Sequence, residues 1–216
     1  MALSAKKAIR NGKDAAESKA LILRAALEEF AQEGFAGART EHIAKAAGVN
    51  IALLFYYFKN KEQLYGAVLE SNYAEWNRRM MEALELEASP KEKIRAYAAT
   101  YFDFASETPS RPRLTLQEMM RAGRTGSPHI VKLKRKYIKP VHERIKRTMR
   151  EGVAAGEFRA MDAEHFIYSV FGIINMYFAC AQAIKVVSGN EPLDPKVIAQ
   201  RRGEVMRFIT QALFAK

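Results

Sequence analysis

The chain has 216 residues, of which 49% are hydrophobic and 27% are charged, a balance that is typical of globular proteins and argues against disorder. Its formal net charge of +11 indicates an anionic partner, with nucleic acid ahead of a membrane surface. The single cysteine, Cys180, excludes an intrachain disulfide and suits a reducing compartment. The polar N-terminus lacks the apolar segment of a signal peptide, so we expect a cytoplasmic protein.

Residues 1–16 combine lysines and an arginine with Gly, Asn and Ser, and we expect them to form a flexible basic arm. Such an arm is either a solvated terminus or a segment that follows the DNA backbone or enters the minor groove, and the sequence does not decide between these uses. Over residues 18–33, apolar side chains recur at helical spacing. They predict a first helix that covers the two helices after it.

Residues 39–58 have the pattern of two short helices joined by a tight turn. Small and apolar side chains within residues 43–47 share one face of the first helix, and Gly48 then allows the chain to turn. Asn50 is a good N-cap for a second helix over residues 51–57. Two such helices with a glycine at the turn predict a helix-turn-helix, whose second helix enters the DNA major groove.

This stretch and its flanks resemble the TetR family of bacterial regulators. The segment LILRAALEEFAQEGF (residues 21–35) is similar to that family's first helix, and KNKEQLYGAVL (residues 59–69) is similar to the start of its fourth. The agreement covers roughly fifty consecutive residues, which is far more specific than an isolated helix-turn-helix. The resemblance implies a dimeric, all-α transcription regulator, usually a repressor that a small molecule releases from DNA.

Several positions depart from the family pattern and bear on DNA recognition. Arg39 stands where the family usually has Ser or Thr, so we expect Thr40 to cap the first motif helix. Phe55 replaces a usual Tyr and cannot offer a hydroxyl to a phosphate. The positions that usually face bases are apolar here, so they can contact thymine methyl groups but cannot form bidentate hydrogen bonds. The residues implied to bind DNA are Arg39, Thr40, Asn50, Ile51, Ala52, Leu53, Tyr56, Tyr57 and Lys61.

Capping and helix-breaking residues predict the elements beyond the motif. Asn60 caps a helix over residues 61–87, and this helix N-terminus places Lys61 where we expect a phosphate contact. Pro140 lies inside the seventh predicted helix and should kink it. The later helices are expected over residues 90–107, 110–123, 127–155 and 163–187, the last of these capped by Asp162, with a final helix starting at Asp194-Pro195.

Residues 166–184 contain no charged side chain, and such a length approaches that of a membrane span. Ser169, Asn175 and Gln182 interrupt the stretch, so we interpret it as a helix buried on all sides and expect no membrane insertion. The helix predicted over residues 127–155 is rich in lysine and arginine. We interpret this charge as a solvated outer face, with a second patch for DNA or a membrane surface as the alternative.

The last two predicted helices are more apolar than one chain needs. A symmetric dimer explains the excess if both helices pair with their copies in a four-helix interface, and the TetR resemblance implies the same assembly. The expected interface residues are Tyr177, Ile184, Val205, Phe208 and Ile209.

Aromatic residues and methionines concentrate in the middle helices, where they form either plain core or the wall of a ligand cavity. Asn175 is the most specific candidate, because a buried amide needs partners and a ligand can supply them. The resemblance implies a cavity of this kind for an unknown small molecule. The candidate ligand-binding residues are Trp76, Tyr97, Tyr101, Phe104, Met119, Tyr137, Phe171, Asn175 and Phe178.

The sequence offers little for catalysis. Its four histidines lie far apart without a second ligand at helical spacing, so we expect no metal site. Cys180 lies in an apolar helix and is expected to be an inert core residue. Because neither a nucleophile with its base nor a phosphate-binding loop appears, we expect no cofactor and no enzyme activity.

The sequence therefore predicts an all-α protein with an arm over residues 1–16, a three-helix DNA-binding domain over 17–65, and a larger regulatory and dimerisation domain over 66–216. We expect a homodimeric, sequence-specific repressor that a small molecule releases from a palindromic operator in double-stranded DNA. An architectural or weakly specific DNA-binding protein is the main alternative. An all-α enzyme that uses Cys180 is a weaker one.

Overall fold

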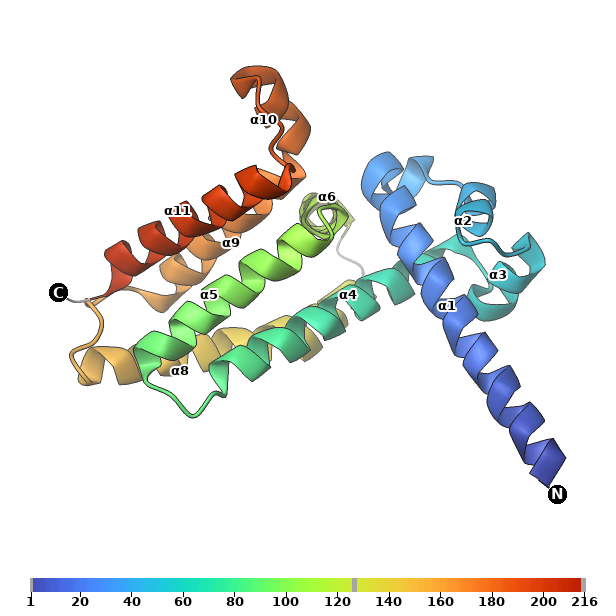
Figure 1. Cartoon of the computed structure of the whole chain (residues 1–216), viewed down its shortest axis with the longest axis horizontal. Coiled ribbons are helices and arrows are strands. Elements are labelled where there is room, and N and C mark those ends of the chain that lie inside the picture. The colour runs from blue at the N-terminus through green and yellow to red at the C-terminus, as the bar shows by residue number, and fades with distance from the viewer. Residues whose placement is uncertain (1, 126–127, 215–216) are drawn as a thin grey trace. The chain divides into compact units, whose positions relative to one another are not determined.

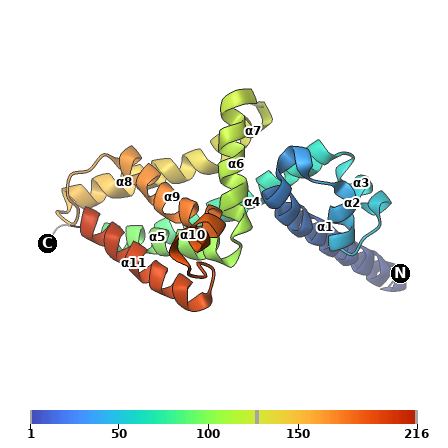
Figure 2. The ribbon, with the colours of Figure 1, turned by 90° about the horizontal axis from the view of Figure 1, so that it is seen from above.

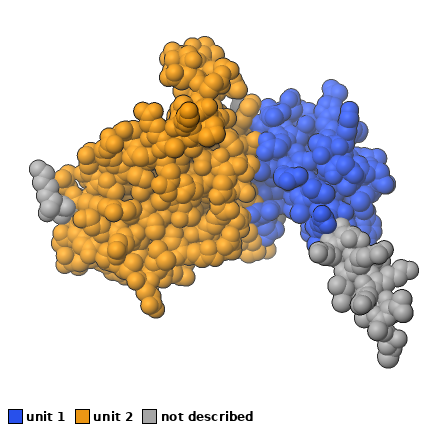
Figure 3. Space-filling view, in the orientation of Figure 1, with its two compact units in different colours: residues 1–71 blue, residues 72–216 orange. Residues whose placement is uncertain are grey.

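The computed structural model describes the backbone of residues 2–125 and 128–214 and the side chains of residues 15–121 and 130–214. In these ranges its regular secondary structure is helical, with one isolated β-bridge between Phe158 and Phe214 (Figure 1). The prediction of an all-α protein is confirmed. The chain divides into two compact units, residues 1–71 and 72–216 (Figure 3), whereas the sequence placed the boundary after residue 65.

The first unit is a small helical domain around one apolar core. It contains α1 (Ala2–Gly37), α2 (Thr40–Ala46), α3 (Ile51–Phe58) and the start of α4 (Lys61–Leu84). α2 packs against both α1 and α3. Ile22, Phe30, Ile43, Leu54 and Leu64 are fully buried between these helices.

α1 begins at Ala2, so the expected helix start near residue 18 was wrong. The basic segment expected to form an arm is the N-terminal part of this helix. Alanine and lysine favour helix, and no proline interrupts residues 2–37. Near the other end Gly34 has a φ of +69° and breaks the helical path, a conformation that glycine adopts without steric cost.

The second unit is a bundle in which α5 is central. Its elements after α4 are α5 (Pro90–Glu107), α6 (Ser110–Thr125), α7 (Pro128–Leu133), the π-helical turn η1 (Lys134–Ile138), α8 (Lys139–Ala154), α9 (Ala163–Ala179), α10 (Ala181–Ser188) and α11 (Pro195–Leu213). α5 contacts α8, α9 and α11, and α6 packs against α9 (Figure 2). Ile94, Tyr97, Phe102, Ile145 and Phe178 belong to the core of this unit.

Three predicted helix caps are confirmed by their hydrogen bonds. Asn60 Oδ1 accepts a backbone N–H from the first turn of α4 at 2.8 Å. Asp162 and Asp194 accept backbone N–H groups in the same way at the starts of α9 and α11. Each cap satisfies donors that a helix N-terminus leaves without intrahelical partners.

Two helices that were predicted to be continuous are interrupted. η1 separates α7 from α8 and ends two residues before Pro140, where a kink was predicted. Pro140 lacks the N–H that an α-helix would direct at the carbonyl of residue 136. The helix predicted over residues 163–187 breaks at Cys180, where α9 and α10 bend by 72°. No glycine or proline lies at this second break, so the local sequence does not explain it.

Among the described residues, no single helix is long and apolar enough to span a membrane. α9 and α10 together pass that test by length and composition, although they form a bent pair. In the structure α9 buries Phe166, Val170, Ile174 and Phe178 inside the second unit.

Candidate DNA-binding surface and effector cavity

The first motif helix is anchored through its N-cap position, which Arg39 occupies. The expectation that Thr40 caps this helix was wrong, because Thr40 is already its first helical residue. The Arg39 backbone N–H donates to Glu29 Oε1 of α1 at 2.9 Å, and His42 Nδ1 lies 3.4 Å from the same oxygen. Glu29 therefore ties α1 to the start of α2 and leaves the exposed Arg39 side chain outside this contact.

The turn and the second motif helix follow the predicted pattern. Gly48 makes the turn with a φ of +67°, which glycine adopts freely. Asn50 Oδ1 accepts the Leu53 backbone N–H at 2.7 Å, so the predicted N-cap of α3 is confirmed. Leu54 and Phe58 of α3 are buried in the core of the first unit. The opposite face of α3 is exposed.

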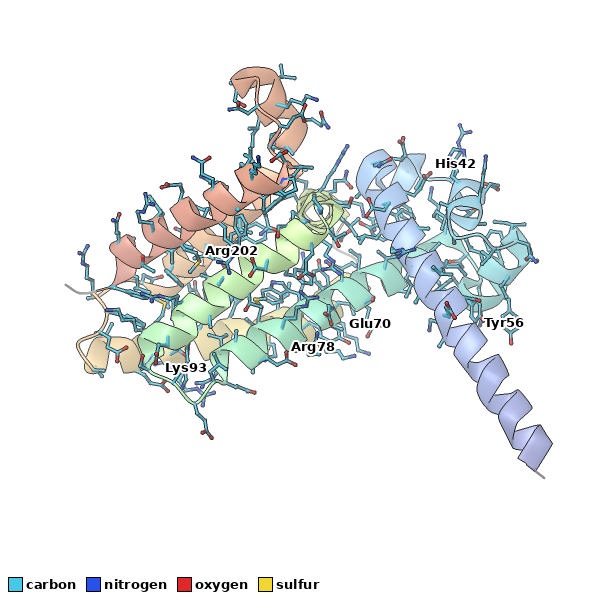
Figure 4. The ribbon with its side chains drawn as sticks, viewed as in Figure 1. His42, Tyr56, Glu70, Arg78, Lys93 and Arg202 are labelled. Carbon is cyan, nitrogen blue, oxygen red and sulfur yellow. The ribbon has the colours of Figure 1, made fainter. Side chains whose placement is uncertain are left out.

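The exposed side of α3 carries residues that were predicted to meet DNA. Ile51, Ala52 and Tyr56 are exposed, and the exposed fraction of Tyr56 is 78%. Figure 4 shows the Tyr56 side chain on this helix. Leu53 and Tyr57 are half-buried, and the Tyr57 ring meets Tyr56 edge to face at 5.4 Å. The polar side-chain groups within α3 are its two tyrosine hydroxyls. α3 therefore presents a largely apolar surface with the hydroxyl of Tyr56 projecting from it.

The ammonium group of Lys61, at the first position of α4, is held by its own chain. Lys61 Nζ donates to the Ala36 carbonyl at 3.1 Å and lies 5.2 Å from the centroid of the Phe35 ring. An ammonium has three N–H donors, so two remain for a phosphate. Lys61 thus also fixes the start of α4 to the end of α1.

The second unit contains a cavity of about 510 Å³, a size typical of small-molecule sites. Side chains from the successive helices α4 to α9, both included, form its wall. Most of the residues predicted to bind a ligand meet there, namely Trp76, Tyr97, Tyr101, Phe104, Met119, Phe171 and Asn175.

Two of the predicted ligand-binding residues do not line the cavity. Phe178 is buried in the core, where its ring contacts Phe102 edge to face at 5.3 Å. Tyr137 lies in η1, where its backbone carbonyl accepts a hydrogen bond from Asn77 Nδ2 of α4 at 2.7 Å. Both were selected for their aromatic spacing, which does not distinguish a cavity wall from core packing.

Asn175 lies on the cavity wall, where a ligand was expected to form hydrogen bonds with its amide. Other residues of the protein bind its amide nitrogen instead. Its Nδ2 donates to the Tyr101 hydroxyl at 2.6 Å and to the Phe171 carbonyl at 3.0 Å. Burial raises the pKa of Tyr101, partly opposed by the Asn175 hydrogen bond, so this hydroxyl stays protonated. Asn175 therefore orients Tyr101 at the cavity wall.

One turn of α4 carries three polar groups, of which Trp76 was predicted to bind a ligand whereas Asn72 and Tyr73 were not. Asn72 Oδ1, Tyr73 Oη and Trp76 Nε1 are buried and have no hydrogen-bond partner among the described residues, and all three side chains line the cavity. Burial, followed by the charge of Glu118, raises the pKa of Tyr73, so its hydroxyl is neutral. The signal was available, because Asn72 and Trp76 are four residues apart and share a helix face.

Two family profiles cover most of the chain. The profile described as "Bacterial regulatory proteins, tetR family" matches residues 22–68, and the one described as "YcdC-like protein, C-terminal region" matches residues 69–216. The chain belongs to the TetR family. It is accordingly a helix-turn-helix, DNA-binding transcription regulator and not an enzyme.

Individual TetR-family proteins are similar over nearly the whole chain. The HTH-type transcriptional regulator RutR of Escherichia coli strain K12 is 29% identical over 195 residues, covering 90% of both chains. FadR of Bacillus subtilis, solved in complex with stearoyl-CoA, has a TM-score of 0.63 at 21% identity and covers 88% of this chain and 96% of its own. A transcriptional regulator of Saccharomonospora viridis, solved with choline, has a TM-score of 0.67 at 21% identity and covers 93% and 100%. The two solved structures share the fold of this TetR-family chain.

The residues predicted to form a dimer interface in this TetR-family chain differ in accessibility. Val205 and Ile209 are buried in the core of their own unit, so their assignment to an interface was wrong. They lie on the inner face of α11, whereas Phe208 lies on the outer face and is 61% exposed. Tyr177 and Ile184 are half-buried, and the Tyr177 hydroxyl donates to the Pro192 carbonyl at 2.9 Å.

The cap of α3 yields a prediction that separates folding from base recognition. Asn50→Ala removes the 2.7 Å hydrogen bond to the Leu53 N–H and should lower the free energy of unfolding by about 1 kcal/mol. Asn50→Ser retains a capping oxygen but lacks the amide donors, so it should keep the melting temperature while changing base preference in the same direction as alanine. Thermal unfolding and competition binding to DNA variants measure the two effects. Equal destabilisation by serine and alanine would contradict the capping role.

Lys61 offers a test of phosphate contact. Lys61→Ala should weaken binding to all DNA sequences to a similar extent and reduce the slope of log affinity against log salt by about one. Lys61→Arg, which keeps the charge, should retain most of the slope. DNA-binding titrations at several salt concentrations measure it, and a loss confined to one DNA sequence would contradict the phosphate role.

Proposed function

We propose that the protein is a homodimeric repressor that binds a palindromic operator through two copies of α3 and leaves it when a small molecule occupies the cavity of the second unit. The observation that carries the ligand response is the cavity of about 510 Å³, which has a largely apolar wall and buried polar atoms with no hydrogen-bond partner among the described residues. Such a combination is typical of ligand sites. FadR was solved with stearoyl-CoA and the S. viridis regulator with choline, and both have the fold of this chain. These complexes support the proposed response to a small molecule.

Exposed apolar side chains on the last helices support the dimer. Tyr168 and Met176 of α9 and Phe208 of α11 are all at least half exposed, although large apolar groups are usually buried. A second copy that covers α9 and α11 with its own would bury them in a four-helix interface. Two α3 helices in such a dimer would meet successive major grooves of an inverted repeat.

Release requires that the ligand favours a dimer whose α3 helices no longer fit those grooves. α4 is the element that we expect to transmit the change. It begins at Lys61, the proposed phosphate contact, and its later residues Asn72, Tyr73 and Trp76 line the cavity. A ligand that binds these side chains differently in the two dimer states would shift the population between them.

The test is selection of bound sequences from a randomised DNA pool at physiological salt. An inverted repeat with half-sites about one helical turn apart would support the dimeric, sequence-specific repressor and supply the operator for ligand assays. The Ile51→Ala variant serves as a control, because it should change preference only at the positions that α3 contacts. Salt-sensitive binding without a consensus would contradict the proposal and favour an architectural DNA-binding protein, which the apolar surface of α3 would then explain.

A further inference from the structure

We propose that the cavity of the second unit selects an amphipathic organic anion, with a neutral polar group against α4, an apolar body across the aromatic wall, and anionic oxygens beside the basic residues of α6, η1 and α8. This inference rests on the proposed ligand response and specifies the chemistry of the ligand. It draws on two independent features of the described residues: polar atoms of α4 that lack a hydrogen-bond partner there, and cations of the same wall that form no salt bridge there.

The α4 side of the cavity requires a hydrogen-bonding group. Trp76 Nε1 can only donate, Asn72 Oδ1 can only accept, and the Tyr73 hydroxyl can do either. None of them has a hydrogen-bond partner in the described part of the chain, an arrangement that is costly for buried groups. A hydroxyl, amide or similar group on a ligand would both accept from Trp76 and donate to Asn72. This group should be neutral, because the buried carboxyl side chain of Glu118 raises the pKa of Tyr73 through its charge and would repel an anion nearby.

The remaining polar wall is basic. Arg111, Lys134, Arg135 and Lys139 line the cavity, and none of them forms a salt bridge with a described residue. Lys146, also on the wall, differs because Glu164 binds it at 2.7 Å. The wall residues include one acidic side chain, Glu143. Several unpaired cations around one cavity raise its potential and favour an anionic ligand.

Arg111 is a half-buried cation of this wall and would gain from an anionic partner, whereas Arg135 and Lys139 are exposed to solvent. The Arg111 guanidinium lies 4.2 Å from the centroid of the Phe104 ring, and Nη1 is 3.4 Å from the Phe104 carbonyl. Burial lowers the pKa of Arg111, since the charged group is partly removed from water. A carboxylate or phosphate would replace the lost hydration with charge-assisted hydrogen bonds.

The aromatic wall could instead suggest a cationic ligand, because ring faces attract cations. Two observations oppose that choice. The Phe104 ring already has the guanidinium groups of Arg111 and Arg79 at 4.2 and 5.4 Å from its centroid. A ligand cation would also enter a cavity whose wall carries excess positive charge. The rings therefore serve the apolar body of the ligand.

Trp76 provides a direct readout, because it is the only tryptophan in the chain and lies on the cavity wall. The probes are a ten-carbon ω-hydroxy carboxylic acid, the matching diol and the matching amino alcohol, which share the hydroxyl and the chain but differ in charge at the other end. We expect saturable changes in Trp76 fluorescence with the full-length protein. The acid should bind at least about tenfold more tightly than the diol, a difference of about 1.4 kcal/mol in binding free energy. The amino alcohol should bind most weakly of the three.

Variants test each end of the cavity. The double variant Lys134→Gln/Arg135→Gln should weaken the acid about tenfold and leave the diol unchanged. Its matched control, Lys132→Gln/Arg147→Gln, removes two exposed cations that do not line the cavity and should change neither. Tyr73→Phe should weaken the ω-hydroxy acid relative to the plain ten-carbon acid without lowering the melting temperature, since the hydroxyl has no described partner to lose.

The outcomes separate this inference from the proposed function. Preferential binding of the amino alcohol, equal binding of acid and diol, or no fluorescence change with any probe would overturn the inference. If the amino alcohol binds best and also releases the operator, the ligand response holds and the inference fails. If the acid binds with the expected selectivity but operator binding is unaffected, the ligand class stands and the release mechanism fails.

Discussion

The Phe208→Glu variant is expected to sediment as a monomer of 24.4 kDa, and the unaltered protein is expected to sediment as the proposed dimer at twice that mass. Phe208 is 61% exposed on the outer face of α11, and its aromatic ring would be buried in the proposed four-helix interface. The two-fold axis of a dimer places both copies of the new carboxylate in the same apolar interface. Burying two unpaired charges of like sign costs far more free energy than the apolar contacts of this interface can offset.

The substitution should leave the fold of each chain intact, because Phe208 faces away from the core residues Val205 and Ile209. Helical content by circular dichroism should therefore be unchanged. Leu86→Glu is the matched control: Leu86 is also a large exposed apolar residue, but it lies in the segment between α4 and α5 and should not affect the mass. An unchanged mass for Phe208→Glu would refute the assignment of α11 to the interface.

Loss of the dimer should also reduce operator binding. A dimer places two α3 helices on one operator, so the second contact forms at a high effective concentration. This strengthens binding by a factor of about 10² to 10⁴. Phe208→Glu should lose this factor on an inverted repeat and lose little on a single half-site. Titration of both DNA duplexes separates an effect on dimerisation from one on the DNA-binding surface itself.

Within the first unit, the turn after α2 and the helix α3 could be predicted in detail because their determinants are local, whereas the start of α1 and the cap of α2 were predicted wrongly. Gly48 requires a turn, Asn50 caps the helix that follows it, and the spacing of Leu54 and Phe58 fixes which face of α3 is buried. The same reasoning located Asp162 and Asp194 at helix starts. In each case the relevant side chain acts on backbone groups within a few residues, so no knowledge of the tertiary structure was needed.

The second unit was less predictable because distant segments decide its details. The break at Cys180 has no local signal, and the apolar stripe of α11 did not reveal that Val205 and Ile209 face the core while Phe208 faces outward. Aromatic spacing suggested part of the cavity wall but not Asn72, Tyr73 or Arg111. Those residues are informative because other helices bury them or bring them together, and only the folded arrangement shows this.

Gly152→Ala is expected to destabilise the second unit, although alanine normally favours a helix. Gly152 is buried in α8, and a Cβ atom added there would overlap the ring of Phe158. Overpacking of this kind costs about 1–3 kcal/mol, and occasionally more, against a gain of at most about 1 kcal/mol from helix propensity. For a chain of this size the melting temperature should fall by roughly 2–4 °C for each kcal/mol lost.

The Phe158 ring cannot easily move away from the new methyl group. Its backbone N–H donates to the Gly152 carbonyl at 3.1 Å, and its ring stacks on Phe214 with centroids 5.6 Å apart and planes at 9°. The neighbouring Arg159 N–H is bound to the Leu213 carbonyl at 2.9 Å. Contacts with both α8 and the end of α11 therefore hold the ring over Gly152.

A double-mutant cycle with Phe158→Ala tests this account. Phe158→Ala alone should cost about 3–5 kcal/mol, because it deletes a buried ring. In that background the clash is absent, so adding Gly152→Ala should be neutral or stabilising by up to about 1 kcal/mol. The two substitutions are thus strongly non-additive, as residues in direct contact usually are. Chemical denaturation of the four proteins measures the coupling, and an equal cost of Gly152→Ala in both backgrounds would show that the Phe158 ring is not the cause.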